Sequence, residues 1–575
     1  MKILAAQINL TVGDLLGNFE KMKAIISQHP SVDLIVFPEL ALSGYPPLDL
    51  TERVGFCEEQ LTYLDKLAQA TLYTKATVIV GYFDKNTKGV GKPFHNGLAV
   101  LRGGEIKYRY FKRLLPTYNI FDESRHFESG DVIGTYELNG VKLGLLICED
   151  MWNDKAVTTN FIYPINPVKE TAEAGVDLIV SINASPSNVG KPEYRLERFA
   201  KIAADYKTPL IYVNQVGGND DIVFDGTSFA VDADGTTHIR LPSFEEDLCQ
   251  VIFDKTTKSF DSVFFSGVVY EGNAEEAKKK RPEAYFHYRQ IVLGIRDYVR
   301  KCGFKKAAIA CSGGVDSAIV LALAVDAIGA ENVVAITMPS AISSTGSVTD
   351  SEKLCENLGV NLYSYPIANI VDSFLGNFTE SFGEAKRSIT KENLQARVRG
   401  TLLMGFTNEF EGYLPLTTGN KSECAVGYCT IYGDMNGGLA PISDLYKTEV
   451  WELCRLYNDL KWREVIPNVI IDKEPSAELY EGQKDTNSLP PYPVLDAVLI
   501  PYIEGNEVAP ALLEKCKKVV QENGFTDFAK IHRMVDRAEF KRRQAAPTIR
   551  VHQKAWGSGR RLPIAQRHNP VNAIV

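Results

Sequence analysis

Short apolar runs recur through the first 255 residues and are separated by amphipathic segments. Runs of this length that are rich in Val, Ile and Leu are typical of buried strands, and the opening residues predict a strand as well. The runs are LIVF (34–37), TVIVGY (77–82), GLAVL (97–101), LGLLI (143–147), DLIVSI (177–182) and LIYVNQV (210–216). Strands that alternate with helices and loops in this way predict an α/β fold with a sandwich or a layered sheet.

A different pattern begins at residue 286 and has the spacing of β-α-β units. In chain order it predicts a helix at about 287–301, a strand at 307–311, a glycine-containing turn, a helix at about 317–328, a strand at 333–339 and a helix at about 349–358. Strands joined by helices of this kind form a parallel sheet. The second half is therefore predicted to be a doubly wound parallel sheet.

The stretch between the two patterns is polar and highly charged. Its sequence EGNAEEAKKKRPEAY (271–285) fits a linker and a solvated helix equally well. We place the first domain at 1–260, the linker at 261–285 and the second domain at 286–575. The tail after residue 540 is rich in Arg and Lys and is interrupted by Gly, so loops are expected there.

Composition and charge exclude several classes of protein. Hydrophobic residues make up 45% and charged residues 23% of the 575, which is ordinary globular composition and excludes disorder for the bulk of the chain. With 63 Lys and Arg against 72 Asp and Glu, the net charge of −9 argues against sequence-independent binding of nucleic acid. Ten scattered cysteines without a CxxC pair fit reduced thiols in a cytoplasmic enzyme.

Neither a membrane span nor a zinc site is expected from the local sequence. The most apolar helical stretch, 318–328, is interrupted by Asp326 and is much shorter than the roughly 20 residues that a span needs. The eight histidines form no HxxxH motif and no Cys/His cluster.

Three polar residues stand next to apolar runs or a loop and together suggest amide hydrolysis. Cys148 follows the run LGLLI, Glu39 follows LIVF, and Lys112 precedes a proline-bounded loop. A lone cysteine at such a place is more often a core residue. A thiol, a carboxylate and a lysine, however, supply the nucleophile, the base and the cation for the oxyanion that hydrolysis through a thioester requires.

The Glu-Lys-Cys order resembles the triad of the nitrilase/amidase superfamily. Segments 115–123, 183–191 and 212–226 resemble the glutaminase domain of the glutamine-dependent NAD+ synthetases. The resemblance implies a nitrilase-like α-β-β-α sandwich. It also implies that glutamine is bound by Tyr118, Ser185 and Lys191. Thr117 stands where family members often have Asn, and residues 153–171 fit no pattern that we can assign.

A second motif, SGGVDS, follows the predicted strand at 307–311. Its small residues let backbone N–H groups approach an anion, and the next helix presents its positive end. The alternative is a plain tight turn between strand and helix. The motif lacks the GK[ST] ending of the nucleotide P-loop and resembles the pyrophosphate loop of the ATP pyrophosphatases. Its residues are Ser312, Gly313, Gly314, Val315, Asp316 and Ser317.

Later segments resemble the synthetase domain of the NAD+ synthetases, which extends the resemblance over nearly the whole chain. These segments are 392–400, 417–428, 432–451, 475–485 and 539–547. The implied fold is a doubly wound sheet of the adenine nucleotide α-hydrolase type. The implied ATP contacts are the SGGVDS loop, Thr418, Lys447 and Ser476. The implied contacts to deamido-NAD+ are Asn393, Arg397, Glu423 and Lys541, and Asp316 and Glu423 would bind Mg²⁺.

Alternatives remain for the basic residues among these contacts. Arg397 and Arg399 are two residues apart in a predicted helix and so lie on different faces, which leaves at least one of them with a structural role. The run KRRQ (541–544) is also consistent with an exposed basic patch.

The resemblance implies an ATP-dependent carbon–nitrogen ligase that acts on glutamine, ATP and deamido-NAD+. Cys148 would release ammonia from glutamine, and the ammonia would amidate adenylated deamido-NAD+ to give NAD+, AMP, pyrophosphate and glutamate. A cytoplasmic homo-oligomer formed through synthetase-domain dimers is expected, with Mg²⁺ as cofactor and an internal path for ammonia. The alternatives are a similar ligase with another acid acceptor and a silent N-terminal scaffold.

Overall fold

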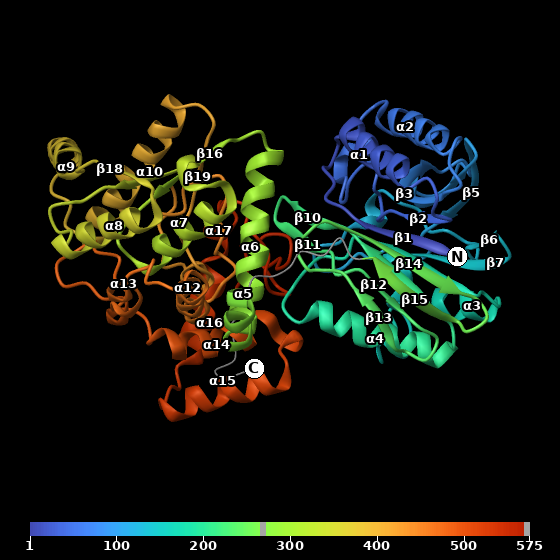
Figure 1. Cartoon of the computed structure of the whole chain (residues 1–575). Helices are drawn as coiled ribbons and strands as arrows, with labels where there is room; N and C mark the ends of the chain where they lie inside the picture. The colour runs from blue at the N-terminus through green and yellow to red at the C-terminus, as the bar shows by residue number, and fades with distance from the viewer. Residues whose placement is uncertain (265–271, 569–575) are drawn as a thin grey trace. The chain divides into compact units, whose positions relative to one another are not determined.

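The computed structural model describes residues 1–264 and 272–568. The chain divides into two compact units, Met1–Val269 and Tyr270–Val575 (Figure 1). Among the described residues, no helix combines the length and the apolar character that crossing a membrane requires.

The first unit contains two large sheets. The seven-stranded sheet has the order β15-β14-β1-β2-β3-β4-β5, with β1 (Lys2–Gln7), β2 (Leu34–Val36), β3 (Thr77–Lys85), β4 (Phe94–Arg102), β5 (Glu105–Phe111), β14 (Asp247–Asp254) and β15 (Ser259–Phe264). The six-stranded sheet has the order β13-β12-β9-β8-β7-β6, with β6 (Thr135–Leu138), β7 (Val141–Ile147), β8 (Leu178–Asn183), β9 (Leu210–Asn214), β12 (Phe229–Val231) and β13 (Thr237–Arg240). A hairpin pairs β10 (Val216–Asn219) with β11 (Ile222–Asp225).

Alternation along the strands explains why these sheets form layers. Ile3 on β1 belongs to the core that also contains Leu145 on β7, whereas its neighbour Leu4 packs with Phe19 of helix α1. Helices α1 (Leu15–Gln28) and α2 (Phe56–Ala70) cover the seven-stranded sheet, and α3 (Pro167–Glu173) and α4 (Lys191–Tyr206) cover the six-stranded sheet (Figure 1). The predicted α-β-β-α sandwich is confirmed.

Parallel pairing brings strand ends with polar residues to one edge of each sheet. Strand β2 pairs in parallel with β1 and β3, and Glu39 follows it within three residues. Strand β7 pairs in parallel with β8, and Cys148 follows it directly. In both cases a buried strand holds the segment that carries the polar side chain.

The second unit is built on a parallel sheet with the order β18-β17-β16-β19. Its strands are β16 (Lys306–Ala310), β17 (Val333–Thr337), β18 (Asn361–Ser364) and β19 (Tyr413–Leu416). Leu403 of α10 (Ser388–Glu409) packs on the face formed by Ala308, Val334 and Ile336, and α7 (Val315–Ile328) contacts β16 and β17. The predicted doubly wound parallel sheet is confirmed.

The order of these strands places the SGGVDS loop at a topological switch point. The chain passes from β16 to β17 and β18 on one side and reaches β19 on the other side of β16. In doubly wound sheets, ligands bind beyond the carboxyl ends of the strands at such a point. The turn after β16 is therefore at the place where this fold offers a binding crevice.

Several further helices complete the second unit. They are α5 (Gly272–Lys280), α6 (Pro282–Lys301), α8 (Thr345–Leu358), α9 (Ala368–Phe382), α11 (Lys421–Val426), α12 (Lys447–Lys461), α13 (Asn468–Asp472), α14 (Tyr492–Glu504), α15 (Pro510–Glu522), α16 (Phe528–Arg537) and α17 (Glu539–Arg542). Of the predicted linker 261–285, residues 265–271 lie outside the described residues, and the rest completes β15, forms α5 and begins α6. Residues 543–568 follow α17 as turns and loops.

Candidate functional site

The first unit contains a buried lysine held between two carboxylates. Lys112 Nζ donates hydrogen bonds of 2.8 Å to Glu39 Oε1 and of 2.8 Å to Glu123 Oε1. None of the three residues is more than 6% exposed. Buried charges are tolerated only when they are paired and hydrogen-bonded, so this arrangement fixes the position of all three groups.

Further hydrogen bonds fix the orientation of both carboxylates. Asn96 Nδ2 donates to Glu39 Oε1 at 2.8 Å, and the backbone N–H of Ala184 donates to Glu39 Oε2 at 2.9 Å. Tyr45 OH donates to Glu123 Oε1 at 2.8 Å. Gly81 on β3 leaves room for the turn at Glu39, because a Cβ at Gly81 would lie 2.2 Å from the backbone nitrogen of Leu40.

Cys148 stands on a strained turn between β7 and a short 3-10 helix, Cys148–Met151. Its φ of 42° is unusual for a residue with a side chain and is sustained by the surrounding contacts. Asp150 supplies these contacts: one carboxylate oxygen accepts from the Ile147 N–H (3.0 Å) and from Tyr110 OH (2.8 Å), and the other accepts from the Leu114 N–H (3.0 Å). The thiol is thus rigidly held.

Burial and charge within this site together favour a protonated lysine and a protonated thiol. Burial lowers the pKa of the Lys112 ammonium, but the carboxylates of Glu123 and Glu39 outweigh burial and raise that pKa well above its ordinary value. Burial raises the pKa of the Cys148 thiol well above its ordinary value, Glu39 raises it further, and Lys112 partly opposes both. A base must therefore remove the thiol proton before Cys148 can attack.

The structure pairs Lys112 with Glu39, and the charges of both act on the Cys148 thiol, although the three residues come from separate segments of the sequence. It adds Glu123 as a second carboxylate on the lysine. Glu123 ends the segment LPTYNIFDE, so its position was visible in the sequence, but nothing in the local pattern shows that the loop folds back onto Lys112. Asn96 on β4 carried no such signal, because it lies inside a strand.

A hollow of about 220 Å³ opens beside the residue that follows Cys148. Its walls include Tyr118, Glu149, Trp152, Tyr163 and Tyr194. Tyr118 OH donates to both oxygens of Glu149 at 3.0 Å, and Tyr163 OH donates to one at 3.1 Å. Burial raises the pKa of Glu149 to about 7. Residues between 153 and 163, which the sequence left unassigned, form part of this wall.

The other two predicted glutamine contacts lie around this region in different ways. Lys191 is the first residue of α4, and its Nζ lies 5.7 Å from the centroid of the Trp152 ring in the wall of the hollow. Ser185 is buried just beyond β8 and does not line the hollow; its N–H donates to Asn214 Oδ1 at 2.9 Å. Ser185 directly follows Ala184, which binds Glu39.

The second unit contains a cavity of about 280 Å³ beyond the carboxyl ends of β16, β17 and β19. Of the predicted ATP contacts, the cavity is lined by Ser312, Gly314, Val315, Asp316, Ser317, Thr418, Lys447 and Ser476. Gly313 is the exception. Its φ is 73°, and a Cβ there would lie 2.4 Å from the backbone oxygen of Ser347, so only glycine lets the loop approach α8 this closely.

Acidic side chains gather around Lys447 at one end of this cavity. Lys447 Nζ donates to Asp316 Oδ2 at 2.5 Å and to Glu423 Oε1 at 3.2 Å. Burial raises the pKa of Glu423 to about 7, which Lys447 opposes and the charges of Asp316 and Asp485 reinforce. Asp485 Oδ1 is buried without a hydrogen-bond partner in the described structure. This end of the cavity therefore holds three carboxyl groups beside one lysine.

The predicted dinucleotide contacts divide into two groups. Glu423 lines the cavity. Asn393, Arg397 and Lys541 do not line it, and they contact the segment 427–431, of which Tyr428 is a lining residue. Asn393 Oδ1 accepts from Thr430 Oγ1 (3.0 Å), Arg397 Nε donates to the Ile431 oxygen (3.3 Å), and Lys541 Nζ donates to the Gly427 and Cys429 oxygens (2.7 and 2.8 Å).

Arg399 and Lys473 line the cavity and were not predicted as contacts. Arg399 Nε donates to the Met338 oxygen at 3.1 Å, and Lys473 Nζ donates to Ser347 Oγ at 2.7 Å. The two-residue spacing of Arg397 and Arg399 showed that they differ in orientation but not which one faces the crevice. Lys473 stands just before the segment 475–485, so its position in the sequence indicates that it lies near this cavity.

Comparison with known proteins agrees with this division of the chain. Residues 2–260 match the family model of carbon-nitrogen hydrolases, and residues 287–545 match that of NAD synthases. A glutamine-dependent NAD+ synthetase of Synechocystis sp. is 41% identical over 575 residues, with 99% of each chain covered. A protein of the same name from Thermotoga maritima is 38% identical over 592 residues, also with 99% of each chain covered.

A solved structure extends the likeness to three dimensions. It is a glutamine-dependent NAD+ synthetase from Acinetobacter baumannii in complex with ADP; it is 38% identical, covers 98% of each chain and superimposes with a TM-score of 0.74. The likeness to these proteins extends over nearly the whole chain and includes the sequence, both domains and the fold. This chain therefore belongs to the glutamine-dependent NAD+ synthetases.

Proposed function

We propose that this enzyme carries out the last step of NAD+ biosynthesis with glutamine as the nitrogen donor. One site converts glutamine and water into glutamate and ammonia. The other joins ammonia to deamido-NAD+ at the expense of ATP and yields NAD+, AMP and pyrophosphate. The observation that carries this proposal is the buried Lys112, which pairs with Glu39 and whose charge acts on the Cys148 thiol. It is found in a chain whose full-length relatives are glutamine-dependent NAD+ synthetases.

In the glutaminase reaction, Glu39 removes the proton of the Cys148 thiol and the sulfur attacks the side-chain amide carbon of glutamine. The Lys112 ammonium stabilises the oxyanion, a contribution typically worth about 3–4 kcal/mol. The carbon–nitrogen bond breaks as Glu39 returns the proton to the leaving nitrogen, so ammonia departs and a thioester remains. Water then attacks the thioester, and glutamate leaves. Tyr118, Ser185 and Lys191 are proposed to bind the substrate.

In the synthetase reaction, the nicotinate carboxylate of deamido-NAD+ attacks the α-phosphorus of ATP and expels pyrophosphate. Activation is needed because a carboxylate is a poor acceptor for an amine. Ammonia then attacks the acyl carbon and AMP leaves. Lys447 and the loop from Ser312 to Ser317 are proposed to bind the phosphates, since these residues line the cavity at the switch point of the sheet. Thr418 and Ser476 are proposed to complete the ATP contacts.

The dinucleotide is proposed to contact Asn393, Arg397, Glu423 and Lys541. Glu423 lines the cavity directly. The other three side chains form hydrogen bonds with the segment 427–431. They would therefore contact the dinucleotide at the margin of the cavity or act on it through that segment.

Mg²⁺ fits the acidic end of the cavity. Asp316 and Glu423 offer hard carboxylate oxygens, and Asp485 adds a buried oxygen without a hydrogen-bond partner among the described residues. We assign the ion to Asp316 and Glu423. When bound there, Mg²⁺ would neutralise charge on the phosphate oxygens of ATP.

We further propose that the enzyme is a cytoplasmic homo-oligomer built on synthetase-domain dimers. The described residues contain no disulfide, which suits a reducing compartment. The net charge of −9 favours small-molecule substrates over nucleic acid as partners.

The direct test of this proposal is an assay with purified protein, ATP, Mg²⁺, glutamine and deamido-NAD+. We expect equimolar NAD+, AMP and pyrophosphate. Failure of deamido-NAD+ to support AMP formation would reject the proposed acceptor and favour a related ligase with another acid substrate.

A further inference from the structure

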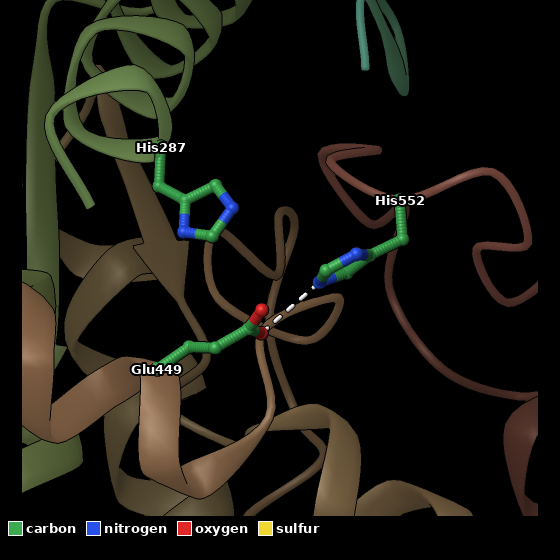
Figure 2. Close-up of side chains that lie close together, drawn as sticks. All are labelled: His287, Glu449 and His552. Carbon is green, nitrogen blue, oxygen red and sulfur yellow. Dashed lines mark hydrogen bonds and ion pairs between the residues drawn. The ribbon is translucent and has the colours of Figure 1, made fainter. Parts of the chain in front are cut away.

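Two histidines and a glutamate from distant parts of the second unit converge on one point (Figure 2). His287 comes from α6, Glu449 from the first turn of α12, and His552 from the loop region after α17. One ligand atom from each lies within 4.8 Å of the others. No sequence motif predicts this cluster, because the three residues lie in separate segments that only the fold brings together.

His287 is the feature of this cluster that calls for an explanation. It is 2% exposed, and neither of its ring nitrogens has a hydrogen-bond partner in the described structure. Buried polar atoms are rarely left without a partner, because the lost hydration is not replaced. Its ring lies 5.7 Å from that of His552 and points toward the same space as the Glu449 carboxylate (Figure 2).

The other two side chains are already oriented toward that space. His552 Nε2 lies 3.0 Å from Glu449 Oε2, and the same oxygen accepts from the Tyr446 N–H at 2.8 Å. Asp444 Oδ2 accepts from the N–H groups of Val551 and His552 at 2.7 Å each, which fixes the loop that carries His552. Only His287 lacks a hydrogen-bonded place in the cluster.

The donor set selects a class of ion. Two imidazoles and one carboxylate are ligands of Zn²⁺ and similar divalent transition metals, whereas Mg²⁺ prefers oxygen ligands alone. Tetrahedral Zn²⁺ with ligands at about 2.0–2.1 Å holds them about 3.3 Å apart, so ligand atoms that now lie within 4.8 Å of one another would approach by up to about 1.5 Å. The His552 and Glu449 side chains are 18% and 25% exposed, which leaves access for the ion and for a water ligand.

We propose that His287, Glu449 and His552 bind one divalent transition-metal ion, best suited to Zn²⁺, that ties α6, the start of α12 and the C-terminal loop together. The site differs in chemistry from the carboxylate pair assigned to Mg²⁺. Its ligands are far apart in sequence, so the bound ion cross-links the second unit much as a structural zinc does.

Cobalt spectroscopy on the full-length enzyme tests this proposal independently of activity. Chelator-treated protein is titrated with Co²⁺, and we expect one equivalent to produce visible d–d absorption without thiolate charge-transfer bands, which Zn²⁺ then abolishes. His287→Asn and His552→Asn should each weaken this binding by at least about 100-fold. His126→Asn is the matched control, because His126 stands in the other cluster of histidine and acids in the described chain, with Asp49 and Glu52.

Each outcome decides the proposal. It is overturned if the wild type binds no stoichiometric Co²⁺, if both variants bind it unchanged, if thiolate bands accompany it, or if His126→Asn is the variant that loses it. Circular dichroism and thermal unfolding without metal show whether each variant is folded. If His287→Asn is not folded, His552→Asn on the more exposed loop decides. Zn²⁺ should raise the melting temperature of the wild type and not that of either variant.

Discussion

The ammonium of Lys112 lies 2.8 Å from Glu39 Oε1, and both side chains are buried. An ion pair of this kind is favourable only while both partners are present, since either one alone would be an uncompensated buried charge. The same pair is proposed to supply the base and the oxyanion stabiliser of the glutaminase, so stability and activity should depend on it together.

Replacing Lys112 by Met should therefore damage both properties. Loss of the oxyanion contact predicts glutaminase activity that is lower by roughly 10²–10³-fold. Loss of the cation between Glu39 and Glu123 predicts a decrease of about 3–5 kcal/mol in the free energy of unfolding. Glutamate release and urea unfolding measure the two effects.

The matched control for this change is Lys21→Met. Lys21 also lies 2.7 Å from a glutamate, Glu246, but both side chains are exposed to solvent by a third or more. Exposed pairs contribute at most about 1 kcal/mol, so we expect nearly normal stability and activity. Equal losses in the two variants would show that burial of the Lys112 pair carries no special role.

Glu149 predicts a specific dependence of stability on pH. Its pKa in the folded protein is about 7 because of burial, above the ordinary value of 4.5. Between these two pH values the folded state retains a proton that the unfolded state has released, so stability falls as the pH rises. The Glu149→Gln variant lacks this proton equilibrium and keeps an acceptor for Tyr118 and Tyr163.

The stability of Glu149→Gln relative to wild type should therefore improve between pH 4.5 and pH 7.5, by up to about 3 kcal/mol. Urea unfolding of both proteins across this range measures the difference, in which the titrating groups that do not interact with Glu149 cancel. Two parallel stability curves would contradict the assigned pKa.

Asp316→Asn tests the acidic end of the synthetase cavity. We expect NAD+ synthesis to fall by at least about 10³-fold with glutamine and with ammonium alike, because the neutral amide of Asn binds Mg²⁺ much more weakly than the charged carboxylate of Asp. Asp326→Asn is the control: it is the same change on the same helix, at a residue that binds Tyr288 and Lys461 and does not line the cavity. NAD+ synthesis that survives in Asp316→Asn by either route would count against the metal assignment.

Transfer of ammonia between the two reactions can be measured with isotopes. At neutral pH, ammonia in solution is almost entirely protonated and does not act as a nucleophile. If the ammonia released by Cys148 is used before it equilibrates with solvent, [15N]ammonium should be poorly incorporated into NAD+ while unlabelled glutamine is saturating. Incorporation in proportion to the ammonium present would mean that the two reactions are not coupled.

The strand ends and the turn that carry functional residues could be predicted, because the sequence within a few residues determines them. The apolar runs before Glu39 and Cys148 end where the strands end, and parallel pairing of such strands brings their ends to one edge. The SGGVDS turn was predictable for the same reason, since a strand and a helix enclose it. In each case the signal lies within a few residues of the functional group.

Other contacts could not be predicted, because they depend on how distant segments pack. Glu123 reaches Lys112 only after its loop folds back, and Asn96 reaches Glu39 only through the register of β4. His287 and His552 meet because α6 and the C-terminal loop pack in the same unit. Absence of a metal-binding motif in the sequence therefore does not exclude a site assembled by the fold.

The central claim is that one chain contains a thiol-dependent source of ammonia and a separate AMP-forming ligase, and the nitrogen source of Cys148→Ala tests it most directly. NAD+ formation by this variant is measured with glutamine and with ammonium, beside Cys249→Ala, which removes another buried thiol of the same unit. We predict that Cys148→Ala loses glutamine-driven synthesis by at least about 10³-fold and retains ammonium-driven synthesis, while Cys249→Ala retains both. Glutamine-driven synthesis that persists in Cys148→Ala would contradict the account.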